Sequence, residues 1–138
     1  MASGLPPCGA GEQRNACQKE AAGGEVRGER LSGRVLNLGA DWQTVFDAGY
    51  AELDTRYAIE THDGALIDIR NFGYRHGPPE VLKRLAAGED VDPSEYYMRT
   101  LPRLSSGDPR YAWVNRTIFI GTGARHADCV VIQVFEVL

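Results

Sequence analysis

Residues 50–61 form the longest run in which apolar and polar side chains alternate. Leu53 and Tyr57 fall on one face of an extended strand, because successive strand side chains point to opposite sides. Asp63-Gly64 follows, and an Asp-Gly pair is a strong hairpin signal. Residues 65–72 return with an alternation of their own. This hairpin predicts an antiparallel sheet. The rest of the chain must add strands to that sheet or cover its apolar face.

Turn residues divide the remaining chain into further short segments. The predicted strands are 29–36, 41–46, 95–101, 110–120 and 129–138. Between them, Pro78-Pro79 opens a short run with an acid in its first turn and apolar residues at helical spacing, which predicts one helix that ends at Gly88. The last strand is apolar on both faces except Gln133 and Glu136, as is typical of a strand that seals a barrel. The pattern predicts an all-β, antiparallel barrel with one short helix, since closure removes exposed edges.

The first 28 residues lack this patterning. Glycines interrupt them repeatedly, and they offer little apolar surface to offset the entropy of ordering. We therefore expect a flexible tail over residues 1–28 and a single barrel domain over residues 29–138.

Composition excludes several classes of partner. The net charge of −4 and the pI of about 5.3 remove the electrostatic attraction on which binding to nucleic acid or an anionic membrane depends. Cys8, Cys17 and Cys129 are widely spaced, so no disulfide framework or metal site is indicated. No cofactor motif, signal peptide or membrane-spanning run is visible. We expect a cytoplasmic protein with no metal or cofactor and with a small-molecule ligand.

Several ordered blocks of the sequence resemble the DUF3237 (UPF0311) family. They are residues 33–36, 39–43, 51–57, 70–71, 75–81, 92–100 and 111–116. The resemblance runs from about Gly24 to Leu138, and it implies a lipocalin-like or calycin-like up-and-down barrel with a ligand cavity. Some members of the family are implicated in cyclisation or isomerisation of small natural products.

One departure from the family concerns the N-terminus. Family members usually begin with one or two further strands before the block at Gly23-Gly24, whereas residues 15–20 have no strand pattern. We therefore expect a barrel that lacks a strand. The gap would be filled by a neighbouring subunit in a homo-oligomer, or the barrel would stay partly open.

Candidate site residues are polar or aromatic side chains expected to face the barrel interior. Asp41 is a candidate general acid or base, because the ring of Trp42 would reduce its solvation; the alternative is a turn aspartate that caps its own loop. Asp54 and Arg56 are two apart on one face and would form an ion pair that orients a substrate, or else a solvated outer pair.

The remaining candidates, together with Trp42, would bind the substrate. Asn71, Tyr97, Arg99 and Asn115 are donors suited to a developing negative charge on a substrate oxygen, with Arg99 grouped with the catalytic aspartates. For Asn71 and Asn115 the alternative is a structural network between strands. Trp113 would supply a flat wall for a ligand, or would be part of the core.

Two functional readings follow from these residues, with a third kept open. The first is a cofactor-independent acid-base enzyme of the isomerase, cyclase or hydratase type, acting on a small phenolic or carbonyl-bearing molecule in the barrel. The second is a carrier or sensor that binds such a molecule without changing it. The third is a filled barrel whose surface acts as an interaction module.

Overall fold

The computed structural model describes residues 10–18, 24–127 and 129–138, and within these it leaves the side chains of 10–18, 37, 38, 40 and 41 undescribed. The strands are β1 (Ala10–Gln18), β2 (Gly24–Arg27), β3 (Gly33–Phe46), β4 (Tyr50–Thr61), β5 (Leu66–His76), β6 (Tyr97–Ser105), β7 (Ile118–Arg125) and β8 (Val130–Val137). The helices are α1 (Pro79–Ala86) and two 3-10 segments, η1 (Pro93–Glu95) and η2 (Pro109–Arg116). None of the described helices has the length and apolarity needed to cross a membrane.

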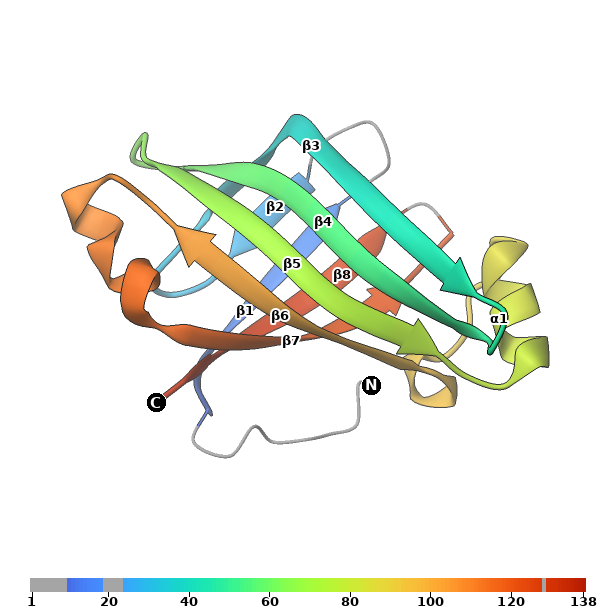
Figure 1. Cartoon of the computed structure of the whole chain (residues 1–138). Helices are drawn as coiled ribbons and strands as arrows, with labels where there is room; N and C mark the ends of the chain where they lie inside the picture. Colours follow the sequence, from blue (N-terminus) through green and yellow to red (C-terminus); the bar gives the residue numbers. More distant parts are fainter. Residues whose placement is uncertain (1–9, 19–23, 128) are drawn as a thin grey trace.

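The eight strands form a closed barrel with up-and-down topology (Figure 1). Each strand pairs antiparallel with the next one along the chain, and β1 pairs with β8 to close the ring. The predicted all-β barrel with one short α-helix is therefore confirmed. The Asp63-Gly64 turn joins β4 to β5 as expected, with Gly64 at φ 88°, a conformation that glycine adopts at little cost.

The N-terminal segment differs from the sequence prediction, since β1 and β2 lie within the expected tail. Backbone pairing explains the difference: β1 is held between β2 and β8, so its hydrogen bonds come from both sides although its sequence has little strand character. The expectation of a missing strand is wrong, because β1 closes the barrel.

The segment after β6 is also different, because the predicted strand 110–120 is mostly η2. The side chain of Asp108 accepts a hydrogen bond from the Arg110 N–H, and Pro109 occupies the first helical turn. An aspartate cap followed by proline is a helix-start signal, and here it outweighs the alternation. Trp113 and Asn115 therefore lie on a 3-10 helix instead of a strand.

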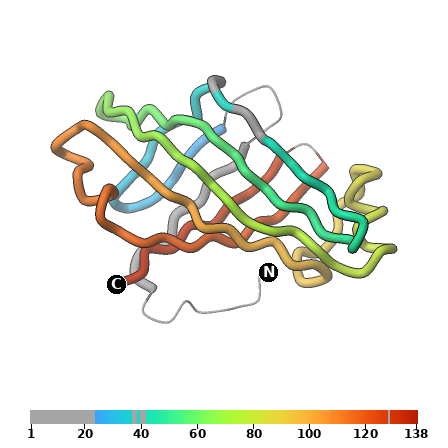
Figure 2. Tube along the Cα trace, in the orientation of Figure 1, coloured from blue at the N-terminus to red at the C-terminus, as the bar shows by residue number. Residues whose placement is uncertain are grey.

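Helices lie at the two opposite ends of the barrel, with η2 at one and α1 at the other (Figure 2). We call these the η2 end and the α1 end. The buried apolar residues form two clusters. The cluster towards the η2 end contains Ile59, Ile67, Leu104 and Phe119 among others. The cluster towards the α1 end includes Val81 and Leu85 of α1, Leu53 of β4 and Met98 of β6.

Candidate functional site

Three polar residues occupy the inner face of the barrel between the two apolar clusters. We call Thr55, Asn71 and Thr100 the interior belt. Thr55 on β4 pairs with Asn71 on β5, and Thr100 on β6 pairs with Gly73 of β5. Alternation places each belt residue on the buried face of its strand, and on β4 the two neighbouring inward positions, Leu53 and Tyr57, belong to the two apolar clusters.

Two atoms of the interior belt lack a hydrogen-bond partner among the described residues: the side-chain oxygen Oδ1 of Asn71 and Oγ1 of Thr100. Both residues are buried, with 4% and 5% of their surface exposed. An unsatisfied buried polar atom costs about 1–3 kcal/mol, so each one calls for a partner such as an ordered water, an ion or a ligand. A Cβ atom at Gly121 would collide with Thr100 Oγ1, so glycine at this position allows that hydroxyl to pack against the backbone of β7.

The described residues of the belt and its neighbourhood are uncharged. Tyr57 lies one inward-facing position beyond Thr55 on β4 and is buried. Burial raises the pKa of Tyr57 to about 12, so its phenol is neutral at physiological pH. The belt therefore offers an amide and hydroxyls, which suit a neutral ligand that both donates and accepts hydrogen bonds.

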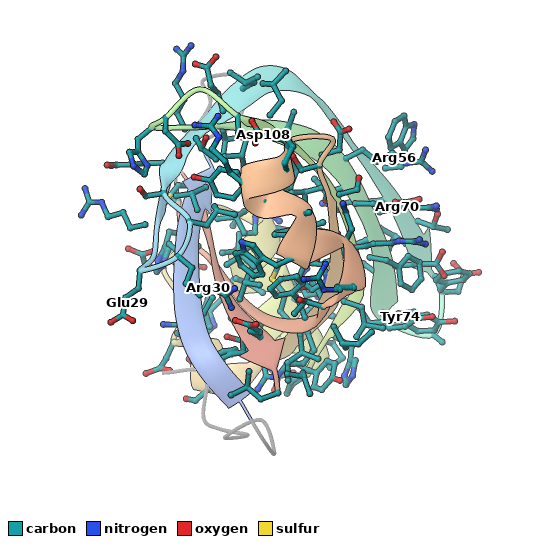
Figure 3. The ribbon with its side chains drawn as sticks, turned by 90° about the vertical axis from the view of Figure 1, so that its left-hand side faces the viewer. Glu29, Arg30, Arg56, Arg70, Tyr74 and Asp108 are labelled. Atoms are coloured by element: carbon teal, nitrogen blue, oxygen red, sulfur yellow. The ribbon has the colours of Figure 1, made fainter. Side chains whose placement is uncertain are left out.

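Paired polar side chains lie at the η2 end, where Arg30 is labelled in Figure 3. Arg30, in the β2–β3 loop, donates from Nη1 to both carboxylate oxygens of Glu136, at 2.8 Å and 2.9 Å. The Glu136 side chain is 8% exposed and that of Arg30 is 45% exposed. The guanidinium of Arg30 also lies 3.7 Å from the ring centroid of Trp113, which packs against the apolar cluster at this end. Trp113 therefore helps to close the barrel.

A second network at the η2 end surrounds Asp63 in the β4–β5 turn. Thr61 Oγ1 and Tyr111 Oη donate to Asp63 Oδ1 at 2.6 Å and 2.8 Å, while Arg110 lies 3.4 Å from Oδ2. These hydrogen bonds, that from Thr61 first, hold the pKa of Asp63 below its usual value. The carboxylate thus ties the hairpin turn to η2 and is already well satisfied.

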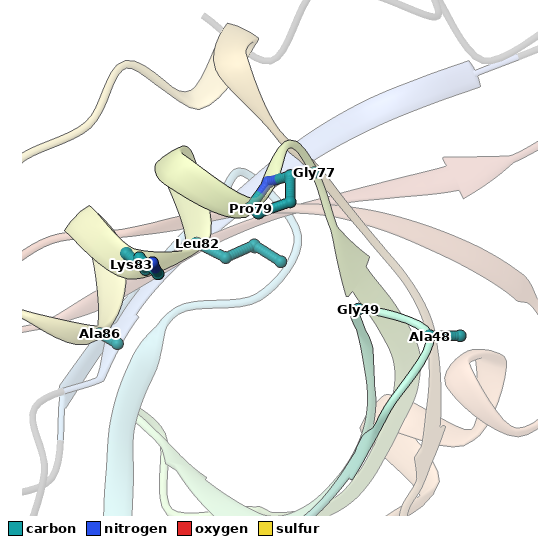
Figure 4. A pocket seen from close by; sticks show the side chains of 7 residues that line it. All are labelled: Ala48, Gly49, Gly77, Pro79, Leu82, Lys83 and Ala86. Carbon is teal, nitrogen blue, oxygen red and sulfur yellow. The ribbon is translucent and has the colours of Figure 1, made fainter.

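At the α1 end an open pocket of about 420 Å³ lies between α1 and the β3–β4 turn (Figure 4). We call it the mouth pocket. Its lining is small and apolar apart from one lysine: Ala48, Gly49, Gly77, Pro79, Leu82, Lys83 and Ala86. The two ends of the barrel therefore differ: the η2 end holds a buried carboxylate paired with an arginine, whereas the α1 end holds a pocket.

The structure places Asp54 and Arg56 on the outer face of β4, so the expectation that they face the interior is wrong. The Asp54 carboxylate lies 3.3 Å from Arg70 and 3.7 Å from Arg56. The hydrogen bond from Arg70 is the main cause that lowers the pKa of Asp54. Arg56 and Arg70 project away from the barrel in Figure 3. This is the solvated outer pair that was the alternative for these two residues.

Trp42, Tyr97 and Arg99 also lie on the outer side. Trp42 is 56% exposed and pairs across the strands with Asp54. Tyr97 stacks on His76 with 4.5 Å between ring centroids. Arg99 donates from Nη1 to the Met98 carbonyl, and its guanidinium lies 5.3 Å from the Tyr97 ring. The structure does not bring these three to the interior belt.

Of the predicted site residues, Asn71 is the one that the structure places in the belt among the described side chains. Asn115 lies on η2, where its amide bonds both the Ser106 N–H and the Ser106 carbonyl, at 2.8 Å and 2.9 Å, which closes a loop. The backbone of Asp41 pairs with Thr55, while its side chain lies outside the described residues.

Sequence reasoning missed Thr55, Thr100, Arg30 and Glu136. Glu136 carried a signal, since an acid in an otherwise apolar strand requires a partner when buried. The threonines carried none, because threonine is common on either face of a strand.

The fold and belt define a class, the small antiparallel barrels with a polar interior. The chain belongs to the family described as "Protein of unknown function (DUF3237)", which matches residues 4–137. The predicted family resemblance is thereby confirmed. A UPF0311 protein of Rhodopseudomonas palustris strain TIE-1 is 51% identical over 116 residues, covering 84% of this chain and 76% of the relative. A UPF0311 protein of Clostridium acetobutylicum is 39% identical over 114 residues, covering 83% and 72%.

Solved structures agree with this assignment. The crystal structure of a conserved protein of unknown function from Rhodopseudomonas palustris has a TM-score of 0.84 at 40% identity and covers 97% of this chain and 100% of that one. A beta-barrel like protein from Acinetobacter baumannii has a TM-score of 0.73 at 35% identity, covering 97% and 99%. A protein described as an enzyme from Penicillium herquei has a TM-score of 0.58 at 17% identity, covering 96% and 99%, and shares the fold alone.

Proposed function

We propose that the protein binds a small, neutral, carbonyl- or phenol-bearing molecule at the interior belt. The observation that carries this proposal is the pair of buried oxygens, on Asn71 and Thr100, that have no partner among the described residues. A ligand hydroxyl would donate to Asn71 Oδ1, and a ligand carbonyl would accept from the Thr100 hydroxyl. Each contact would recover a desolvation cost that the free protein already carries.

The surroundings of the belt support a compact ligand with apolar flanks. Apolar clusters lie above and below the belt along the barrel axis, and aromatic or alkyl parts of a ligand would pack against them. The neutral phenol of Tyr57, on the η2 side, adds a further donor. A charged ligand would meet no opposite charge among the described belt residues, and burying it there would be costly.

Acid-base conversion of the bound molecule is the second candidate. It rests on the register of Asp41, whose backbone pairs with Thr55 of the belt. In this version Asp41 exchanges a proton with the ligand, while Asn71 and Thr100 hold the ligand oxygen. The roles predicted for Asp54 and Arg99 receive no support from their positions on the outer face.

Paired substitutions test the binding site. The probe is 4-hydroxyacetophenone, which carries a phenol and a carbonyl in one neutral molecule. Asn71→Leu and Thr100→Val keep the approximate shape and remove the polar atoms, so we expect calorimetric affinity for the probe to fall roughly 2- to 10-fold for each hydrogen bond lost. Thr122→Val on β7, where Thr122 pairs with outer-face Arg99, is the matched control and should bind normally.

Unfolding in urea separates binding from structure. Because the two belt oxygens are unsatisfied, Asn71→Leu and Thr100→Val should leave the free energy of unfolding unchanged or raise it. A drop of about 1–3 kcal/mol with unchanged probe affinity would mean that the belt is structural and would end the proposal.

For the enzyme version, Asp41→Asn should retain binding but abolish formation of any product that mass spectrometry detects with the unmodified protein. If the probe and related phenols and ketones are all recovered unchanged after incubation with the unmodified protein, the result favours a carrier function.

A further inference from the structure

Strand β3 is paired very unequally on its two edges. On one edge β4 pairs with it from Gly33 to Phe46, interrupted by one irregularity. On the other edge the described pairing with β2 is confined to Gly33 and Arg34. In Figure 1, β3 runs along the margin of the barrel wall, and its arrowhead near α1 has no strand on the outer side. The end of β3 is therefore an edge strand within the described part of the chain.

The end of β3 also lacks the features that usually protect an edge. Residues 42–46 contain no charged residue and no proline, although such residues commonly block strand addition. Trp42 is 56% exposed, Val45 74% and Phe46 37%. Trp42 and Phe46 share one face of the sheet with Thr44, and Val45 lies on the other, so both faces of the strand end present apolar surface.

The sequence of this strand end is symmetric about its centre. It has an aromatic residue at each end, Trp42 and Phe46, and a threonine, Thr44, in the middle. Antiparallel pairing with an identical segment about Thr44 would place Trp42 opposite the partner's Phe46 and Thr44 opposite the partner's Thr44. Cross-strand aromatic pairs and Thr–Thr pairs stabilise antiparallel sheets, so this segment is complementary to itself.

We propose that the protein forms a two-fold symmetric dimer in which the ends of two β3 strands pair antiparallel about Thr44. Such an interface is isologous, because both copies contribute the same surface to it. It joins two barrel walls into one continuous sheet and covers the uncharged edge. It would also border the mouth pocket, because Ala48 and Gly49 in its lining follow β3 directly. The inference is independent of what the barrel binds.

Disulfide trapping tests the register. In a background in which Cys8, Cys17 and Cys129 are replaced by serine, Thr44→Cys would place two thiols across the two-fold axis. Directly opposed residues in antiparallel strands have Cα atoms about 4.5–5.5 Å apart, within the range of a disulfide. We expect mild oxidation to give a covalent dimer on a non-reducing gel. Thr122→Cys, on a strand paired on both edges, is the control and should run as an uncrosslinked monomer on the same gel. Equal crosslinking of the two variants would overturn the proposed register.

Sedimentation velocity tests the dimer itself. The unmodified protein should sediment as a dimer at tens of micromolar, whereas Thr44→Lys should be monomeric, because it sets two like charges directly opposite each other. We expect at least a tenfold rise in the dimer dissociation constant, with an unchanged circular dichroism spectrum. Thr122→Lys should remain dimeric. A monomeric unmodified protein, or a dimer indifferent to Thr44→Lys, would refute the proposal.

Discussion

The two ends of the barrel are built from the same strands but differ in how they are closed. At the η2 end, the buried carboxylate of Glu136 is paired with Arg30, and Asp63 ties its turn to η2. At the α1 end, a pocket separates α1 from the β3–β4 turn, and the end of β3 is exposed on both faces. We therefore expect stability to be concentrated at the η2 end, and the proposed binding surfaces lie from the belt towards the α1 end.

The sharpest test of this comparison removes one apolar side chain from each end. Ile67 is fully buried in the η2-end cluster, so Ile67→Ala should lower the free energy of unfolding by about 3–4 kcal/mol through a lost transfer term and a cavity. Leu82 of α1 is partly buried at the mouth pocket, and Leu82→Ala should cost about 1 kcal/mol or less. Urea unfolding measures both. Equal losses would contradict a stability gradient along the barrel.

An alkaline titration tests the burial of Tyr57, which lies between the belt and the η2 end. The folded-state pKa of Tyr57 is raised to about 12 from 10.0. Its stabilising effect is therefore complete below pH 10 and declines as the pH rises towards 12, because only the unfolded phenol ionises in that window. The loss should reach about 3 kcal/mol, since one unit of pKa corresponds to about 1.36 kcal/mol.

Tyr57→Phe isolates this effect. The variant should match the unmodified protein near pH 7 and lose less stability than it between pH 10 and 12. Identical alkaline curves for the two proteins would show that Tyr57 is more accessible than its burial implies.

The smallest expected change in stability comes from a comparison of two arginine substitutions. Arg30→Ala leaves the buried Glu136 carboxylate without its partner and should cost about 2 kcal/mol, less than the 3–5 expected for a fully buried pair because Arg30 is half exposed. Arg34 pairs with Glu60 on the surface, and Arg34→Ala should cost below about 1 kcal/mol. Chemical denaturation at pH 7 measures both. If Arg34→Ala is the more damaging substitution, the ion pair to Glu136 does not secure the η2 end.

The barrel could be predicted from the sequence because its central hairpin carries strong local signals. Alternation in residues 50–61 and the Asp63-Gly64 turn fix the pairing of β4 with β5, and Pro78-Pro79 marks the start of α1. β1 could not be predicted, because its strand conformation depends on backbone pairing with two neighbouring strands and not on its own sequence. η2 differs from the prediction because the alternation over residues 110–120 favours a strand, whereas the capping signal at Asp108 starts a helix.

The candidate site was less predictable than the fold. Alternation divides a strand into two faces but does not say which face is inside. On β4, the polar face with Asp54 and Arg56 turned outward, whereas the face with Thr55 and Tyr57 is interior. Charged residues are the usual candidates for catalysis, yet Asn71 and Thr100, whose buried oxygens have no partner among the described residues, are neutral. The absence of a partner is a property of three-dimensional packing and leaves no mark on a sequence.

The pairing of β1 with β8 has a consequence for how the protein is made. Asn15 meets Gln133, so the ring is closed by the first and last strands of the chain. Contacts between such distant residues require a large loop to close before they yield any stabilisation, which slows folding. The meander from β3 to β6 needs only pairings between strands that are neighbours in sequence, so it can assemble early, but β1 must wait for β8. β1 is thus made before both strands that it joins, and it is among the last to pair.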